Sequence, residues 1–207
     1  MKIYDISMPY LIGGAHWPGD ISYNYEQVAD IKCGSSVNVG VLTFGVHGGT
    51  HIDAPFHYDK DGKTIDMLCV ENFILPVIVV DAIDKKILDA SLLKNADLSD
   101  VKGVLFKTLA WKDRSIFPMD IPVISPDLAP FLKDNGLTLI GVDVPSVDAI
   151  EDSTVKAHKS LGENNITILE GLVLDNINMG KYELTALPIY LQGSDASPVR
   201  AILKEKK

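Results

Sequence analysis

The hydrophobic pattern of this chain consists mainly of short apolar runs separated by turn-forming residues. Runs of this length that are rich in β-branched residues, or that alternate apolar and polar positions, are typical of β-strands. Residues 37–47, VNVGVLTFGVH, show both properties. The same criteria predict further strands at residues 2–7, 76–83, 102–109, 137–144, 183–191 and 199–205. Several of these runs are apolar throughout, which indicates strands buried on both faces.

Helices are predicted at residues 89–96, 125–136 and 151–164. In the second of these, Ser125 is the expected N-cap, Pro126 is the first helical residue and Gly136 ends the helix. Strands outnumber helices, and the helices fall between strands, which predicts an α/β or α+β domain with a mixed sheet. No repeat, low-complexity tract or linker interrupts the chain, so we expect one domain spanning residues 1–207.

The amino-acid composition and net charge indicate which classes of molecule the protein can bind. Hydrophobic residues make up 46% of the chain and charged residues 23%, as in an ordinary globular protein. The formal net charge of −9 argues against binding a nucleic-acid backbone, which requires clustered Lys and Arg. It does not exclude a small anionic substrate, because a bound metal can reverse the local charge. Neither a signal peptide nor an apolar run of about 20 residues is present, so we expect a cytoplasmic protein without a membrane span.

The chain contains two cysteines, Cys33 and Cys69. They do not form a CxxC pair, so a thiolate zinc site is not expected. A disulfide is also not expected in a chain that is not secreted. We therefore predict two free thiols that are buried or half-buried.

Residues 47–57, HGGTHIDAPFH, contain three of the five histidines and an aspartate. In a straight strand, which rises about 3.3 Å per residue, His47 and His51 would lie about 13 Å apart. Two ligands of one metal, each about 2 Å from the ion, must be much closer. A shared metal therefore requires the chain to turn between the two histidines. The Gly48–Gly49 pair permits such a turn most easily.

With that turn, His47, His51 and Asp53 form a plausible set of metal ligands. Two imidazoles and one carboxylate suit zinc or manganese and leave a coordination position for water. His57 is either a fourth ligand or a nearby acid/base. The alternative interpretation is a solvated loop in which these side chains have no common function.

Outside this stretch, the strongest candidates are His158 and Glu170. Glu170 interrupts the apolar run ITILEGL, where a carboxylate requires solvent or a partner such as a metal. For both residues, a functional and a purely structural role remain open. Trp17 is either an exposed platform for a flat ligand or part of a packed loop, and His16 beside it is expected to lie on a surface loop.

The segment 141–148, GVDVPSVD, allows two interpretations. Asp143 ends a predicted buried strand, and functional residues are frequent at such positions in α/β sheets. Asp143, Ser146 and Asp148 are equally suited to turns or helix caps. The sequence does not decide between them.

The stretch HGGTHIDAPFH resembles the HxGTHxDxPxH signature of the cyclase family of metal-dependent hydrolases. This family includes bacterial kynurenine formamidases (arylformamidases) and isatin hydrolases. Further segments follow the family's order along nearly the whole chain: YDISMPY, WPGD, GVDVPSVD and ALPIYLQGSDASPVRAIL.

The resemblance implies five metal ligands: His47, His51, Asp53, His158 and Glu170. It further implies that Asp53 bridges two ions, with His158 and Glu170 on the second. It implies that His57 donates and accepts protons and that Trp17 contacts the substrate. His16 matches no residue of the family's motifs.

The resemblance also implies a compact α/β fold of the swivelling β/β/α type. The implied cofactor is zinc, as one or two ions, with manganese as the alternative, and the implied assembly is a homodimer or homotetramer. The implied reaction is hydrolysis of a small amide substrate by metal-activated water, in particular of N-formylkynurenine to kynurenine and formate. A cyclic-amide (isatin-type) or lactone hydrolase, and an inactive metal- or ligand-binding protein, remain alternatives.

Overall fold

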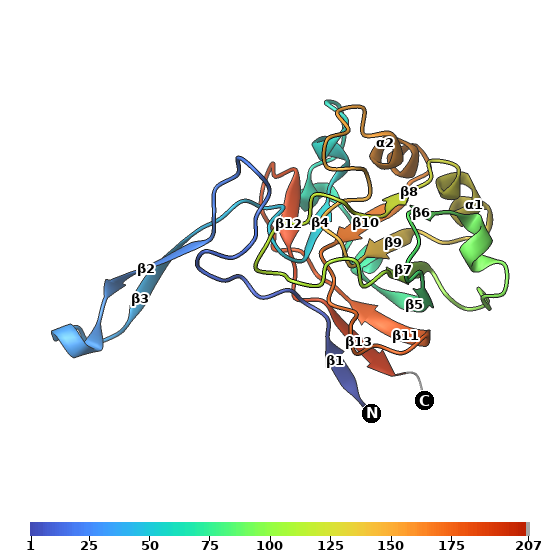
Figure 1. Ribbon diagram of the computed structural model, residues 1–207. Helices are drawn as coiled ribbons and strands as arrows, with labels where there is room; N and C mark the ends of the chain where they lie inside the picture. Colours follow the sequence, from blue (N-terminus) through green and yellow to red (C-terminus); the bar gives the residue numbers. More distant parts are fainter. Residues whose placement is uncertain (206–207) are drawn as a thin grey trace.

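A curled, nine-stranded mixed β-sheet is the framework of the protein in the computed structural model, which describes residues 1–205 (Figure 1). The strand order is β1-β13-β11-β5-β7-β9-β10-β4-β12. These strands are β1 (Ile3–Asp5), β4 (His51–Asp53), β5 (Ile74–Asp81), β7 (Gly103–Lys107), β9 (Leu139–Val142), β10 (Thr167–Glu170), β11 (Gly180–Thr185), β12 (Ala196–Pro198) and β13 (Ile202–Glu205). The central strands β5, β7, β9 and β10 are parallel, and the flanking strands pair antiparallel. The predicted α/β fold with a mixed sheet is thus confirmed.

Both faces of the sheet are buried, as the apolar runs predicted. In β5, Ile78 and Val80 belong to a core on one face, and Val77 and Val79 belong to a core on the other. This division follows from the alternation of side chains along a strand. Helices α1 (Leu128–Asp134) and α2 (Lys156–Glu163) pack into the first core (Figure 1). The curled ends of the sheet itself, including β4, β11 and β13, enclose the second core.

Several of the predicted elements have different boundaries in the structure. The predicted strand at 183–191 is observed as β11, which ends at Thr185. Pro188 lies beyond this end, where its missing N–H cannot interrupt the ladder. Helix α1 begins at Leu128 with Asp127 as N-cap, so the prediction of Ser125 as N-cap was wrong. The reason is that the Ser125 amide donates to the Leu88 carbonyl (2.9 Å) and continues a strand pairing.

That pairing belongs to a small parallel sheet of β6 (Ile87–Leu88) and β8 (Val123–Ile124). The predicted helix at 89–96 is a short 3₁₀ helix, Ala90–Leu93, capped by the Asp89 carboxylate. The other 3₁₀ helices within residues 1–205 are Ile31–Cys33, Pro55–His57, Ile65–Met67 and Val70–Phe73. Among these residues, α1 and α2 are far shorter than the about 20 apolar residues that a membrane-spanning helix requires.

A hairpin of β2 (Asn24–Ala29) and β3 (Val39–Thr43) projects away from the body of the molecule (Figure 1). The predicted strand at 37–47 is therefore shorter, and His47 lies in the turns that follow it rather than at the strand's end. Both cysteines are free, as expected. However, Cys33 near the hairpin tip and Cys69 are exposed, so the prediction of buried or half-buried thiols was wrong.

Candidate metal centre

Strand β4 brings the separate parts of the candidate site together. It lies between β10 and β12, with His51 opposite Glu170 and Asp53 opposite Ala196. His51 and Asp53 are two residues apart, so their side chains emerge from the same face of the strand. The sheet register therefore places a carboxylate from residue 170 beside ligand candidates from residues 51 and 53.

The turn at Gly48–Gly49 brings His47 back toward this strand. The ring centroids of His47 and His51 are 5.1 Å apart, instead of the about 13 Å of a straight strand. Gly49 has a φ of +61°, a backbone conformation that favours glycine. A side chain at Gly171, directly after Glu170, would collide with the Gly49 carbonyl oxygen. The close approach of the two segments therefore depends on glycine at both places.

The two carboxylate oxygens of Asp53 face different histidines. Its Oδ1 lies 3.1 Å from His47 Nδ1 and 3.4 Å from His51 Nε2. Its Oδ2 lies 3.5 Å from His158 Nε2. Each carboxylate oxygen of Asp53 therefore has a histidine nitrogen within 3.5 Å.

Glu170 closes the buried side of the centre. Its side chain is 3% exposed, with Oε2 3.2 Å from His51 Nε2 and Oε1 3.7 Å from His158 Nε2. The same Oε1 accepts a hydrogen bond from the Val147 amide (2.8 Å). The acid within an apolar run thus has both an anchoring donor and neighbouring imidazoles.

The donor atoms fit a divalent metal ion. In the described part of the chain, His51 Nε2 and both carboxylate oxygens of Asp53 are buried without a hydrogen-bond partner. Unpaired buried polar atoms are costly, and coordination of a cation would remove that cost. Within residues 1–205, three sets of donors lie within 4.8 Å of one another: His47, His51 and Asp53; Asp53, His57 and His158; and His47, His57 and Asp195.

Two of the histidines are oriented by hydrogen bonds on their outer side. His51 Nδ1 lies 3.1 Å from the Gly49 carbonyl, and His158 Nδ1 lies 2.7 Å from Asp148 Oδ2. Because both partners accept, each ring donates from Nδ1, and Nε2 is the nitrogen that faces Asp53. Outer partners of this kind commonly fix metal-ligating histidines. Asp148 also accepts from the Ala157 and His158 amides at the start of α2, so it has the cap role that the sequence left open.

Strong negative charge is concentrated in this centre. Burial lowers the pKa of His51, but the Asp53 and Glu170 carboxylates outweigh burial and raise it to about 10. Burial also lowers the pKa of His158, but the Asp148 and Asp53 carboxylates outweigh burial and raise it to about 10. The charge that holds protons on these rings also attracts a dication, which competes with those protons for the ring nitrogens.

His57 lies at the open side of the cluster. It ends the 3₁₀ helix Pro55–His57, and 33% of its side chain is exposed. Its ring centroid is 4.1 Å from that of His47 and 5.5 Å from that of His158. Partial burial lowers the pKa of His57. Its position allows contact both with the centre and with a molecule in the adjoining pocket.

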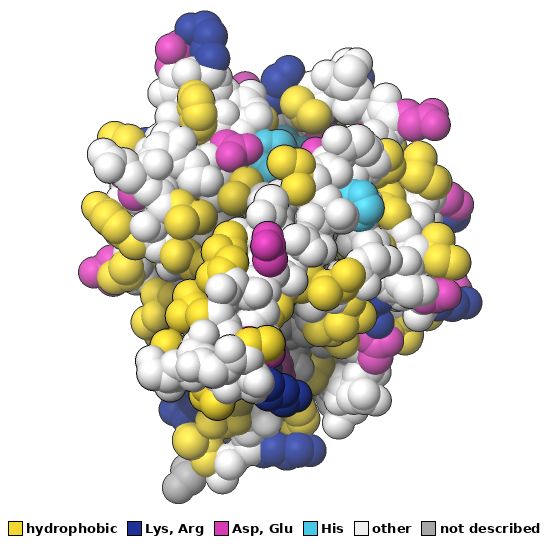
Figure 2. All heavy atoms as spheres, turned by 90° about the vertical axis from the view of Figure 1, so that its left-hand side faces the viewer, with side chains coloured by type: hydrophobic (Ala, Val, Ile, Leu, Met, Phe, Trp, Pro, Cys, Tyr) yellow, Lys and Arg dark blue, Asp and Glu magenta, His cyan; other side chains and the backbone are white. Residues whose placement is uncertain are grey.

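The pocket beside the centre has a volume of about 400 Å³, within the usual range for small-molecule sites. The histidines of the cluster line it together with apolar side chains that include Ile150 and Val155. Trp17 also lines it and packs edge-on against Phe117. His16 contacts the Gly14 carbonyl and does not line the pocket beside the histidine cluster. On the hairpin side of the molecule, histidine side chains reach the surface (Figure 2).

Residues 4–149 match the family model Cyclase, described as "Putative cyclase". The chain belongs to the cyclase family. A kynurenine formamidase from Bacillus cereus is 43% identical over 200 residues, which cover 97% of this chain and 96% of that protein. A kynurenine formamidase from Geobacillus thermodenitrificans is 45% identical over 189 residues, or 91% and 90% of the two chains. The resemblance predicted from the histidine signature is thus confirmed.

Solved structures share the fold of this cyclase-family chain. A "predicted metal-dependent hydrolase" from Bacillus stearothermophilus superposes with a TM-score of 0.82 at 25% identity and covers 98% of this chain and 97% of that one. An isatin hydrolase bound to a product analogue has a TM-score of 0.85 at 22% identity, covering 100% and 93%.

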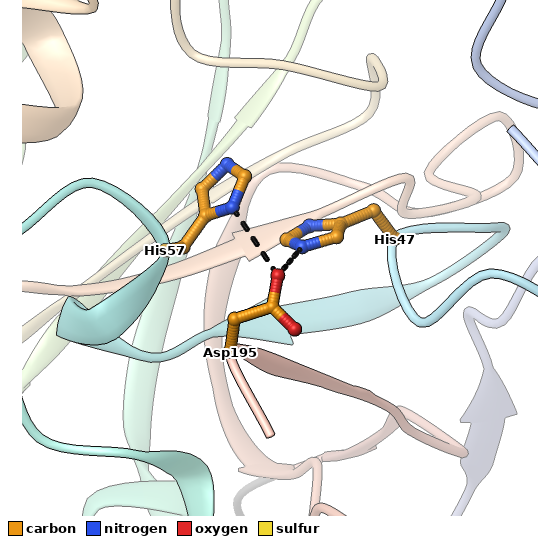
Figure 3. A group of neighbouring side chains, drawn as sticks. All are labelled: His47, His57 and Asp195. Carbon is orange, nitrogen blue, oxygen red and sulfur yellow. Dashed lines mark hydrogen bonds and ion pairs between the residues drawn. The ribbon is translucent and has the colours of Figure 1, made fainter. Parts of the chain in front are cut away.

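The structure of this cyclase-family chain adds one residue that the sequence analysis did not single out. Asp195, directly before β12, places Oδ2 2.8 Å from His47 Nε2 and 3.6 Å from His57 Nδ1 (Figure 3). In the sequence, Asp195 was marked only by its place within ALPIYLQGSDASPVRAIL, one of the segments that resemble the cyclase family. Asp143, by contrast, accepts hydrogen bonds from the Thr108 and Leu109 amides and serves the turn after β7.

Proposed function

We propose that this protein hydrolyses the formamide bond of N-formylkynurenine, giving kynurenine and formate, with the help of bound divalent metal. The observation that carries this proposal is the two-sided Asp53 carboxylate, with histidines on both sides and His57 at the edge of a pocket of about 400 Å³. The choice of substrate is supported by 43% identity to a kynurenine formamidase over 97% of the chain.

In this proposal, His47, His51 and Asp53 would hold a first ion, and Asp53, His158 and Glu170 would hold a second. Nitrogen and oxygen donors in this mixture suit zinc, with manganese as the alternative. Such an ion, when bound, lowers the pKa of water and polarises a carbonyl group.

The protein's own residues then position the substrate and move the protons. His57 accepts a proton from the attacking water and delivers it to the nitrogen of the departing arylamine, which is a poor leaving group when unprotonated. Its exposed edge allows this contact, whereas His51 and His158 are buried. Trp17 and the apolar wall offer packing surface for the aromatic ring of the substrate.

A cyclic-amide hydrolase of the isatin type is the second candidate, favoured by the structural likeness to isatin hydrolase. Ring opening of a cyclic amide requires the same attack on a carbonyl and the same protonation of nitrogen. A lactone hydrolase would need no nitrogen protonation. The shape of the pocket wall, rather than the metal centre, separates these substrates.

Relative rates on N-formylkynurenine and isatin test the choice of substrate. We expect kcat/KM for N-formylkynurenine to exceed that for isatin at least about 10-fold. A factor of ten corresponds to about 1.4 kcal/mol of additional transition-state stabilisation. Both rates are measured on one preparation with the same metal content. A preference for isatin or for a lactone would reject the formamidase assignment and retain the family's chemistry.

We further propose that the protein forms a homodimer or homotetramer through the β2–β3 hairpin. A lone two-stranded hairpin is marginal in water. In the part of the chain that the structure describes, large apolar side chains of this hairpin remain exposed, and Figure 2 shows hydrophobic side chains across this end. They are Tyr25, Val28, Ile31, Val37, Val39, Val41 and Leu42.

The mass of the assembly in solution tests this interface. Light scattering is expected to give a multiple of the chain mass for the wild type. The double variant Val39→Glu/Val41→Glu is expected to shift it toward the monomer, because charges would be buried unpaired in the interface. Met179→Glu, at an exposed apolar position outside the hairpin, is the matched control. A monomeric wild type, or an unchanged double variant, contradicts the proposal.

A further inference from the structure

We propose that Asp195 is a positioning residue that fixes the ring orientation and tautomer of both His47 and His57. This inference rests on the proposed function, because it assigns Asp195 a role in that same centre. A single carboxylate oxygen, Oδ2, faces one nitrogen of each ring: His47 Nε2 at 2.8 Å and His57 Nδ1 at 3.6 Å (Figure 3).

The backbone holds Asp195 firmly at this place. Its carbonyl accepts a hydrogen bond from the Ala54 amide (2.9 Å), directly after β4. The neighbouring Ser194 carbonyl accepts from the Ile65 amide (2.9 Å), and Ala196 pairs with Asp53. Backbone hydrogen bonds therefore hold Asp195 beside β4, the strand that carries His51 and Asp53. This pairing sets the distance between the Asp195 carboxylate and the predicted metal ligands.

For His47, the contact decides which nitrogen faces the metal centre. A carboxylate accepts only, so the 2.8 Å contact places the ring proton on Nε2. Nδ1 lies 3.1 Å from Asp53 Oδ1, where a bound metal ion would take the Nδ1 lone pair in place of a second proton. His47 would therefore offer Nδ1 to the metal, and Asp195 would be the outer carboxylate partner of the ring.

For His57, the same oxygen favours the opposite tautomer. Its Nδ1 faces Asp195, and the other ring nitrogen points away from the carboxylate (Figure 3). A proton on Nδ1 leaves Nε2 free to accept a proton. The 3.6 Å separation is longer than a hydrogen bond, and catalytic contacts of this kind commonly shorten when substrate binds. Asp195 thus links the orientation of a metal ligand to that of the proton carrier.

Two substitutions at Asp195 distinguish positioning of the imidazoles from support of the loop and from direct metal binding. Asp195→Leu has a similar shape and removes both acceptor oxygens, whereas Asp195→Asn keeps one neutral acceptor. Asp66→Asn is the matched control, since the Asp66 carboxylate accepts from the Gly193 amide (3.0 Å) and supports the same loop without contacting an imidazole. Thermal unfolding of each variant establishes that it is folded.

Nitrogen-15 NMR of the histidine rings, with zinc added and substrate absent, reads the tautomers directly. We expect the proton of His57 on Nδ1 and that of His47 on Nε2 in the wild type, and loss of both preferences in Asp195→Leu. We also expect zinc affinity and kcat to fall by about 10- to 100-fold in Asp195→Leu, less in Asp195→Asn, and not in Asp66→Asn.

Three kinds of result would overturn the proposal. The first is a wild-type His57 with its proton on Nε2, or an Asp195→Leu variant that matches the wild type. The second is an equal loss in Asp66→Asn, which would assign the effect to the loop. The third is the loss of one whole zinc ion per chain in Asp195→Leu, which would make Asp195 a direct ligand. Because the ring tautomers are read without substrate, a failure to hydrolyse N-formylkynurenine would leave this test intact.

Discussion

His51→Ala is expected to reduce bound metal from stoichiometric to trace amounts and to abolish measurable amide hydrolysis. The His51 side chain is 1% exposed, and its Nε2 lies within 3.4 Å of both Asp53 and Glu170. Removing the imidazole deletes one of the donors and leaves a cavity beside two buried carboxylates. Elemental analysis of the dialysed variant, with a turnover assay on the same sample, measures both effects.

His16→Ala is the matched control for this prediction. It removes a histidine whose ring contacts only the Gly14 carbonyl among the hydrogen bonds of the described chain. Metal content and turnover are expected to stay at the wild-type level. Stoichiometric metal in His51→Ala would remove His51 from the set of ligands.

His57→Ala has the second largest expected effect, a fall in kcat of at least about 100-fold with bound metal retained. This is the lower range for a positioned acid/base. The metal remains because the buried donors of His51, Asp53 and Glu170 are untouched by the substitution. The measurement is kcat on N-formylkynurenine, alongside metal content.

Added imidazole provides a further check on His57→Ala. The truncated side chain leaves space at the edge of an open pocket, so free imidazole is expected to restore part of the rate. Unchanged turnover in the variant would remove His57 from the proton-transfer role. Loss of metal would instead make it a ligand, as its place in two of the donor sets allows.

The central sheet could be predicted well because its strands are buried on both faces. Runs such as 76–83 and 102–109 are apolar at consecutive central positions, and this pattern predicts the buried strands β5 and β7. The hairpin was harder, because β3 alternates like a half-buried strand although both its faces are exposed. The start of α1 was misplaced because a long-range pairing of Ser125 with Leu88 overrides a favourable local capping signal.

The site residues could be predicted where they are close together in the sequence or where a charged residue interrupts an apolar run. Distance arithmetic located the turn between His47 and His51, and an acid within an apolar run drew attention to Glu170. Asp195 is neither close to the other site residues in the sequence nor within an apolar run. Its partner His47 is 148 positions away, and only the pairing of β4 with β12 brings the two together.

The dependence of N-formylkynurenine hydrolysis on bound metal tests the central claim most directly. The purified protein is stripped with a chelator, and zinc is then returned stepwise while turnover and bound zinc per chain are measured together. We predict almost no turnover in the stripped protein and a rate that rises with bound zinc until the site is filled. Turnover that is independent of metal content, or absent at every level of bound metal, would contradict the proposed function.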